Sequence, residues 1–377
     1  MALKILFVFG TRPEAVKLCP VVRYFQQHVP QLEARVCVTA QHREMLDQVL
    51  SVFGVSPHHD LNAMRPGQTL TAATSRILAD LEPVLAAEKP DMVLVQGDTA
   101  STLCGALAAF YARIPVGHIE AGLRTGDLTK PFPEEMNRVV VSHFTTLHFA
   151  ATEGAAENLR REGVRSGAIS VTGNTGIDAI LHMRDQLERG EARGRDWSFL
   201  DQSDPRKLIV VTAHRRESFG EAFEHICIAL RQLADRPDVR IIYPVHPNPN
   251  VTEPVRRHLE NHPNIYLVEP LDYVSFVDLA RRAYLLITDS GGIQEEAPSL
   301  GKPVVVLREK TERPEAVEAG TAILVGTDVG KITGITAGLL DDAAEYRRMQ
   351  KVHNPYGDGR ASERIATEIL RFFRAAG

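Results

Sequence analysis

Carboxylate side chains in the first half of this sequence stand just after short apolar runs, where a parallel sheet meets its ligand. Asp98 and Glu120 occupy such positions, and Glu134 or Glu135 lies further along the loop that follows Glu120. Carboxylates that converge on one point can take a proton from carbon and return it when their surroundings shift their pKa values. Each also has a structural explanation, since Asp98 can cap a helix, Glu120 can pair with Arg124 and the third can be a solvated loop charge. Acid–base chemistry is therefore predicted from the set and not from one member.

Cationic side chains occupy similar positions and suit an anionic ligand. Arg12 and Lys17 follow the first apolar run, and His214 follows a run in the second half. Positive groups aimed at a departing diphosphate stabilise the charge that develops on it.

The sequence Arg-Pro-Glu-Ala-Val occurs twice, at residues 12–16 and 313–317. Each copy follows an apolar run and puts proline in the first turn of an expected helix, where it is favoured. The repeat is either a coincidence of helix-start chemistry or a sign that Arg12 and Arg313 serve one anionic ligand from two domains.

A glycine-rich turn follows another apolar run and is a candidate phosphate site. In Ser290-Gly291-Gly292 two glycines let a phosphate approach the backbone at the start of a helix. Glu296, further along that helix, can accept hydrogen bonds from both hydroxyls of a ribose. Glycines in a strand–helix turn are often structural, but together with Glu296 and the cationic loops they favour a nucleoside diphosphate.

Several familiar catalytic and binding patterns are absent. No Gly-x-Gly-x-x-Gly follows a run, so no dinucleotide fingerprint is present, and no Gly-x-x-x-x-Gly-Lys-Ser/Thr or Gly-x-Ser-x-Gly occurs. The histidines do not form His-Glu-x-x-His, and no Cys-x-x-Cys pair exists. The sequence therefore predicts neither a cofactor nor a metal.

Length and charge limit the class of protein. The 377 residues suggest two domains, and 43 Lys and Arg against 48 Asp and Glu give a formal net charge of −5. A mildly acidic chain without a basic block is a poor candidate for binding nucleic acid. No apolar stretch approaches the roughly 18–20 residues of a membrane span, and the run at residues 5–9 is better explained as a strand than as a signal peptide. We expect a cytoplasmic protein with no membrane partner.

Short β-branched apolar runs recur along the chain with helix-length segments between them, as in parallel sheets covered on both faces. The runs are 5–9, 36–39, 92–95, 116–119, 146–149, 169–172, 208–212, 241–245, 265–268, 284–288, 304–307 and 323–325. This alternation predicts doubly wound α/β layers. We expect an N-terminal domain at 1–172 and a C-terminal domain at 173–359. The sequence leaves open whether the C-terminal helix, at about 360–377, packs back on the first domain.

These residues together resemble the non-hydrolysing UDP-N-acetylglucosamine 2-epimerases of bacteria over essentially the whole chain. The stretches that carry the resemblance are 9–15, 39–48, 97–99, 117–125, 133–135, 214–217, 288–298, 311–316 and 354–359. The resemblance implies two Rossmann-like domains in a GT-B arrangement with the active site in the interdomain cleft. It implies reversible conversion of UDP-GlcNAc to UDP-ManNAc by anti elimination of UDP, through 2-acetamidoglucal, and re-addition of UDP.

The resemblance also implies roles for particular residues. The implied catalytic set is Asp98, Glu120, Glu134 and His214. The implied substrate contacts are Arg12, Lys17, Phe276, Ser290, Gly291, Gly292, Glu296 and Arg313. Gln41 and His42 match part of an allosteric UDP-GlcNAc site, although Gly67 stands where some members have Arg. No cofactor or metal is implied, and a homodimer is expected.

Three other functions remain open at this stage. A hydrolysing 2-epimerase shares the first chemical step but releases UDP and free ManNAc. A GT-B glycosyltransferase shares the architecture but requires an acceptor. A catalytically silent UDP-sugar sensor would bind without turnover, and the converging acid–base groups argue against it.

Overall fold

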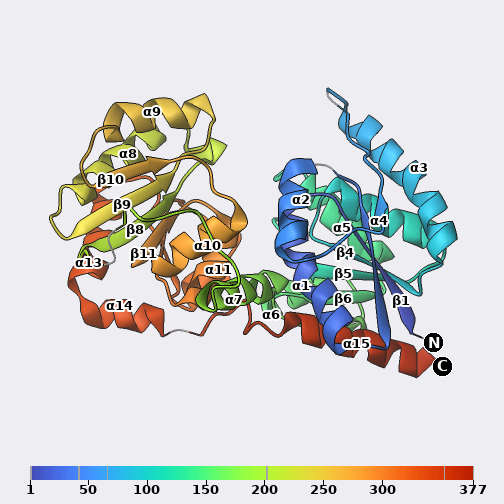
Figure 1. Cartoon of the computed structure of the whole chain (residues 1–377). Coiled ribbons are helices and arrows are strands. Elements are labelled where there is room, and N and C mark those ends of the chain that lie inside the picture. The colour runs from blue at the N-terminus through green and yellow to red at the C-terminus, as the bar shows by residue number, and fades with distance from the viewer. Residues whose placement is uncertain (1, 41–42, 66, 201–202, 352, 377) are drawn as a thin grey trace. The chain divides into compact units, whose positions relative to one another are not determined.

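The computed structural model describes residues 2–40, 43–65, 67–200, 203–351 and 353–376. The chain divides into two compact units (Figure 1). The first unit comprises Met1–Ala179 and Tyr356–Gly377, and the second comprises Ile180–Pro355. Each is an α/β unit built on one parallel sheet.

The sheet of the first unit has seven strands in the order β3-β2-β1-β4-β5-β6-β7. The strands are β1 (Leu3–Phe9), β2 (Leu32–Val38), β3 (His59–Asp60), β4 (Met92–Gln96), β5 (Val116–Ala121), β6 (Leu147–Ala150) and β7 (Ile169–Val171). All neighbouring pairs are parallel. The strand order reverses between β1 and β4, which is where doubly wound folds bind ligands.

Helices cover both faces of this sheet. The helices of this unit are α1 (Arg12–His28), α2 (Arg43–Val52), α3 (Leu70–Glu88), α4 (Ala100–Tyr111), α5 (Glu134–Phe144), α6 (Glu153–Arg161) and α15 (Ala361–Ala376), together with the first residues of α7 (Thr175–Glu188). Alternate residues of β1 show the two faces: Leu6 and Val8 belong to a buried cluster with α3 and α4, whereas Phe7 meets Phe25 of α1 edge to face at 5.5 Å. This two-sided burial explains the continuous apolar runs.

The second unit repeats the arrangement with six strands in the order β10-β9-β8-β11-β12-β13. They are β8 (Lys207–Thr212), β9 (Val239–Pro244), β10 (Ile265–Val268), β11 (Leu285–Thr288), β12 (Val304–Val306) and β13 (Ala322–Leu324). The helices are α8 (Glu221–Ala234), α9 (Pro249–Leu259), α10 (Tyr273–Arg282), α11 (Gly291–Glu296), α12 (Pro314–Glu318), α13 (Val329–Asp341) and α14 (Ala343–Gln350). The order reverses between β8 and β11, and the loops after these two strands carry His214 and Ser290.

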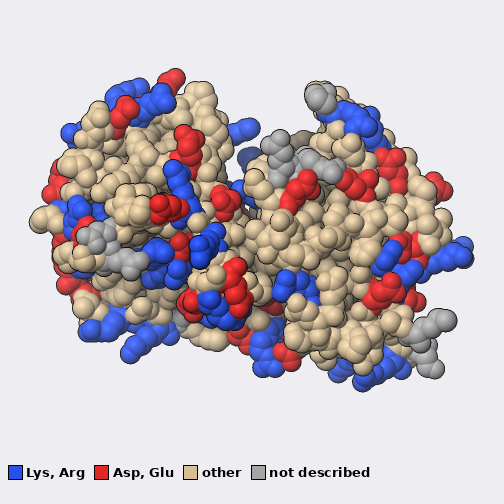
Figure 2. Space-filling model, in the orientation of Figure 1, with Lys and Arg blue, Asp and Glu red and all other residues tan. Residues whose placement is uncertain are grey.

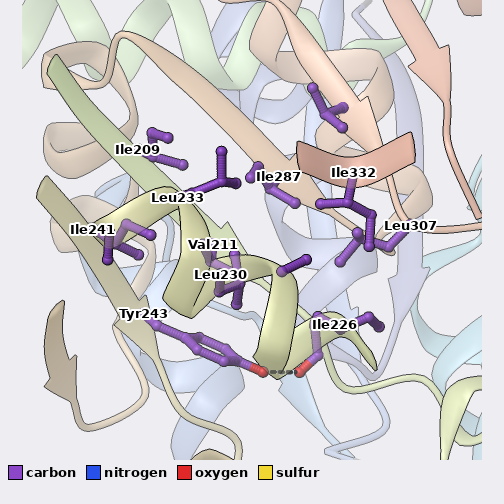
Figure 3. Close-up of a cluster of buried hydrophobic side chains, with 14 of the residues drawn as sticks. Ile209, Val211, Ile226, Leu230, Leu233, Ile241, Tyr243, Ile287, Leu307 and Ile332 are labelled. Carbon is purple, nitrogen blue, oxygen red and sulfur yellow. Dashed lines mark hydrogen bonds between the residues drawn. The ribbon is translucent and has the colours of Figure 1, made fainter. Parts of the chain in front are cut away.

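The core of the second unit lies between its sheet and helices α8 and α13 (Figure 3). Ile209, Val211 and Ile287 of the sheet pack in one buried cluster with Leu230 of α8. Tyr243 is fully buried in the same cluster, and its hydroxyl donates a 2.6 Å hydrogen bond to the carbonyl oxygen of Ala213. The core therefore anchors the backbone at the start of the loop after β8.

Helix α7 begins in the first unit and ends in the second. The amide of Asn174 donates to the carbonyl of Tyr356 at 2.7 Å, and Asp178 accepts from the amides of Ala361 and Ser362 at 3.2 and 2.8 Å. These bonds tie the start of α7 to the returning chain, and the first unit accordingly ends at Ala179 and resumes at Tyr356. Helix α15 packs against α1 in the first unit.

Charged side chains of both signs are interspersed on the face of each unit seen in Figure 2. None of the helices described is long and apolar enough to span a membrane. Among the described residues, no group of three or more His, Cys, Asp or Glu side chains is placed to hold a metal ion. All four cysteines are buried thiols.

Candidate active site

The loop between β1 and α1 is fixed by a buried carboxylate that the sequence analysis did not single out. Glu14 is 1% exposed and closes a capping box with Thr11, whose amide it accepts at 2.8 Å. It also accepts from the Gly10 amide at 3.0 Å and from the hydroxyls of Thr99 and Thr102 at 2.6 and 3.1 Å. Burial raises the pKa of Glu14, and these hydrogen bonds oppose the rise. The loop after β1 is thus joined to the turn after β4.

Glu120 lies at an irregular point near the end of β5. The pairing of β5 with β6 shifts register between Ile119 and Ala121, and Glu120 has a left-handed φ of 64°. Both its carboxylate oxygens accept from Nζ of Lys17 at 2.6 Å, and one also accepts from the side-chain amide of Gln96. A bulge that turns one side chain is common beside active sites. The geometry therefore points the Glu120 carboxylate at Nζ of Lys17 on α1.

Asp98 follows β4 and lies close to Glu120 and Lys17. Its carboxylate accepts from Arg138 of α5 at 2.5 Å, and its carbonyl accepts from the side-chain amide of Asn137 at 2.8 Å. Burial raises the pKa of Asp98, Arg138 lowers it, and the nearby charges of Glu120 and Glu134 raise it again. A carboxyl group with a raised pKa suits proton transfer near neutral pH.

The remaining predicted residues of the first unit differ in their surroundings. Glu134 is the first residue of α5, is partly buried, and lies close enough to Asp98 to affect its pKa. Arg12 is exposed at the start of α1 and makes no hydrogen bond or ion pair with the part of the chain that the structure describes. The structure thus brings the three predicted carboxylates and Lys17 together, whereas Arg12 is exposed and makes no polar contact with the described residues.

In the second unit His214 follows β8 beside a buried aspartate. Asp289 is fully buried and accepts from the amides of His214 and Arg215, both at 2.7 Å. Nδ1 of His214 is 3.8 Å from the other oxygen of Asp289, and the ring stacks on His246 with centroids 5.3 Å apart. The imidazole is 45% exposed, so it is accessible to a ligand.

The turn after β11 gathers the predicted nucleotide contacts. A Cβ on Gly291 would be 3.0 Å from Cζ of Arg313, so the guanidinium lies directly over the glycine. Arg313 is held there by Glu295, to which its Nε donates at 2.7 Å. A Cβ on Gly292 would be 3.8 Å from Oε1 of Glu296 and 4.0 Å from Oγ of Ser290. The missing side chains leave space between a hydroxyl and a carboxylate, next to a guanidinium.

A network of ion pairs supports the loops around this turn. Arg308 donates to Glu217 at 2.6 Å and to both oxygens of Glu312 at 2.6 and 3.0 Å. Burial would raise the pKa of Glu312, but the hydrogen bonds from Arg308 hold it at about 2. The loop after β8 is thereby connected to the segment that carries Arg313.

The remaining predicted residues either lie on other elements or fall outside the described residues. Phe276 is on α10, partly buried. Gln41 and His42 lie outside the described residues. Gln68, beside the departure at Gly67, accepts from Arg76 of α3 at 3.0 Å.

Sequence reasoning missed the groups that support the predicted ones: Glu14, Gln96, His118, Arg138, His246 and Asp289. His246 and Asp289 follow strands and Gln96 is the last residue of β4, so their position was a signal that could have found them. Nothing local marks Arg138 of α5, because its partner Asp98 stands 40 residues earlier in the chain.

A family model described as UDP-N-acetylglucosamine 2-epimerase matches residues 26–370. Curated relatives with the same description include that of Salmonella typhimurium, 54% identical with 99% of this chain and 100% of the relative covered. The relative from Yersinia pestis is 56% identical with 96% and 97% covered. The chain belongs to the UDP-N-acetylglucosamine 2-epimerase family. The predicted family is therefore confirmed.

Solved structures of this epimerase family have the same fold. The Neisseria meningitidis enzyme bound to UDP-GlcNAc matches with a TM-score of 0.90 and 46% identity, covering 98% of this chain and 100% of that one. The Methanocaldococcus jannaschii enzyme in complex with UDP-GlcNAc and UDP matches with a TM-score of 0.79 and 34% identity, covering 98% and 100%. The predicted α/β class with two Rossmann-like units is confirmed. The individual site residues stay predictions.

Proposed function

We propose that this chain interconverts UDP-GlcNAc and UDP-ManNAc without hydrolysis. A base removes the proton at C2 while the bond between C1 and the diphosphate oxygen breaks, which gives 2-acetamidoglucal and UDP. The diphosphate oxygen then adds back to C1, and C2 receives a proton on the opposite face. The observation that carries the proposal is the cluster of Asp98, Glu120 and Glu134 in a member of the epimerase family.

The first unit supplies the proton-transfer groups in this proposal. Asp98, Glu120 and Glu134 form the acid–base set, because the charges of Glu120 and Glu134 are close enough to raise the pKa of Asp98. Lys17 keeps Glu120 in place through its bidentate contact. Removal and return of a proton on opposite faces of one carbon require more than one group, which the set provides.

The second unit supplies the nucleotide contacts. The diphosphate is assigned to Ser290, Gly291 and Gly292, with Arg313 as its cation, and the ribose hydroxyls to Glu296. His214 is assigned to the departing diphosphate, where a positioned hydrogen-bond donor favours the transition state over the bound substrate. Arg12 of the first unit is assigned as a further substrate contact. Phe276 is assigned to the uracil side. No cofactor or metal takes part in the proposal.

The decisive experiment is NMR of the chain incubated with UDP-GlcNAc alone in D₂O. The proposal predicts UDP-ManNAc with deuterium at C2 and no accumulation of free sugar. Free ManNAc together with UDP would identify a hydrolysing enzyme, and turnover only after an acceptor is added would identify a glycosyltransferase. Tight UDP-GlcNAc binding without any product would identify a sensor.

A homodimer and a cytoplasmic location belong to the same proposal. We assign the second copy to the apolar surface of α3 and α4, where Phe110 and Tyr111 are 52% and 69% exposed beside a groove of about 950 Å³. Exposed apolar patches of this kind mark association surfaces. Sedimentation should give a dimer for the wild type and a monomer for Tyr111→Glu, and cell fractionation should recover the protein with the cytoplasmic contents.

A further inference from the structure

A buried histidine lies in β5 behind the candidate carboxylates. His118 is 0% exposed, and its Nε2 is 2.7 Å from the carbonyl oxygen of Gly97. Gly97 directly precedes Asp98, and His118 is two residues before Glu120. One side chain on β5 therefore contacts the turn that carries a carboxylate of the neighbouring strand.

The chemistry of this contact fixes the proton on the ring. A carbonyl oxygen only accepts hydrogen bonds, so Nε2 must carry the hydrogen. Burial lowers the pKa of His118 to about 4; the contact with Gly97 and the charge of Glu120 raise it, while Arg124 and Arg138 lower it. Nδ1 is buried and has no hydrogen-bond partner among the described residues. The ring is thus a neutral donor with its hydrogen on Nε2.

Both the amide and the carbonyl of Gly97 are hydrogen-bonded to residues of β5. Its amide donates to the carbonyl of Ile119 at 3.0 Å, and its carbonyl accepts from His118. Its φ of 72° is a conformation that glycine adopts at little cost. The ends of β4 and β5 are therefore joined at the residue that sets the direction of Asp98.

We propose that His118 is a positioning residue that sets the geometry of Asp98 relative to Glu120 by donating a hydrogen bond to the carbonyl of Gly97. The inference rests on the proposed function. His118 itself exchanges no proton with substrate, and it acts only by fixing the position of the Gly97 peptide. Displacement of a reacting group by about 1 Å can cost about 100-fold in rate, so the loss of this donor should appear in kcat.

Two variants of nearly equal size separate the donor from the packing. His118→Gln keeps an N–H at about the distance of Nε2, whereas His118→Met fills similar space without a donor. We expect His118→Met to lower kcat by about 10- to 100-fold with KM changed less than about 3-fold, and His118→Gln to stay within about 5-fold of wild type. Equal losses in both variants, or a wild-type kcat for His118→Met, would overturn the proposal.

His148 supplies a matched control in the same sheet. It is 2% exposed and lies opposite His118 in the pairing of β5 with β6. Among the described residues its ring interacts with the backbone of Thr145 and makes no hydrogen bond to the Gly97 carbonyl, so His148→Met should keep kcat within about 3-fold. A kcat loss in His148→Met as large as that in His118→Met would show that any buried imidazole of this sheet matters, and would overturn the specific role.

A readout that does not depend on activity separates this inference from the proposed function. In ¹⁵N NMR of the labelled wild-type chain, His118 should show a neutral ring with the hydrogen on Nε2 from pH 5 to 8. A charged ring or an Nδ1–H tautomer would overturn the inference even in an active enzyme. Absence of epimerisation by the wild type would overturn the proposed function, while the nitrogen shifts and a crystal structure of His118→Met would still test whether Gly97 moves.

Discussion

The ion pair between Lys17 and Glu120 gives the sharpest test of how the first unit holds its carboxylates. The side chains are only 15% and 11% exposed, and Nζ lies 2.6 Å from both carboxylate oxygens. Lys17→Met removes the cation and leaves the carboxylate in a poorly solvated position. Breaking a buried ion pair by removing one partner costs about 3–5 kcal/mol. We expect about 3 kcal/mol here, because Gln96 still donates to the carboxylate.

This loss in the free energy of unfolding corresponds to a measurable fall in melting temperature. The first unit has about 200 residues, for which 1 kcal/mol shifts the midpoint by about 2–4 °C. Lys17→Met should therefore melt about 6–12 °C below the wild type in differential scanning calorimetry. Hydrogen exchange read by mass spectrometry should show the loss of protection in peptides of the first unit and not of the second.

A second substitution distinguishes a lost ion pair from damaged packing. Glu120→Gln in the Lys17→Met background removes the carboxylate charge that Lys17 offset, so most of the stability should return. The double variant should be inactive, because the proposed proton-transfer group is gone. A melting temperature of Lys17→Met within about 2 °C of wild type, or a double variant as unstable as the single one, would refute the argument that the pair offsets a buried charge.

Three further predictions follow from the same structure. Asp98→Asn should lower kcat at least 100-fold without lowering the melting temperature, because burial raises the pKa of Asp98 and its charge therefore destabilises the fold near neutral pH; calorimetry and NMR turnover check this. Gly291→Ala should weaken UDP binding about 10-fold in calorimetric titration by displacing Arg313, whereas Gly334→Ala, whose Cβ would meet nothing within 4 Å, should bind UDP normally. Glu88 has its pKa lowered to about 2, chiefly by hydrogen bonds from a guanidinium, so its stabilising contribution is complete above about pH 4.5 and is lost as the pH falls toward 2. Unfolding in urea should accordingly depend less on pH across that window in Glu88→Gln, and an unchanged dependence would contradict the assignment.

The apolar runs predicted the fold well because both sheets are covered on both faces. Strand β3 was the exception, since His59–Asp60 is a two-residue polar edge strand without an apolar run. Composition does not show that residues 174–179 belong with the returning chain from Tyr356, because backbone hydrogen bonds between distant segments make that connection. Whether α15 packs back on the first unit depends on contacts with α1 that neither helix shows alone.

The candidate site was predictable to the extent that it follows from strand ends. Asp98 and Glu120 follow β4 and lie near the end of β5, which are neighbours in the sheet, so their proximity followed from the order of the strands. The two Arg-Pro-Glu-Ala-Val copies do begin helices, but their arginines differ: Arg12 is exposed, whereas Arg313 is held over Gly291 by a carboxylate. Similar sequences therefore gave dissimilar environments, because the partner of each arginine comes from elsewhere in the chain.

The parts of the site that sequence could not predict are those that depart from local preference. Glu120 has a left-handed backbone, which costs a residue with a side chain of order 1–3 kcal/mol, and Asp98 has a pKa raised by burial. Such costs persist only where the surrounding structure offsets them. Here the offset comes from Lys17, from Gln96 and from the hydrogen bond that His118 donates to the turn after β4. These supporting groups look like ordinary strand and helix residues in the sequence, since their role is defined by a contact across strands. It follows that loss of a supporting group such as Lys17 should destabilise the fold, whereas removal of the buried charge itself, as in Asp98→Asn, should remove activity without loss of stability, so a stable, well-folded variant is no sign of an intact site.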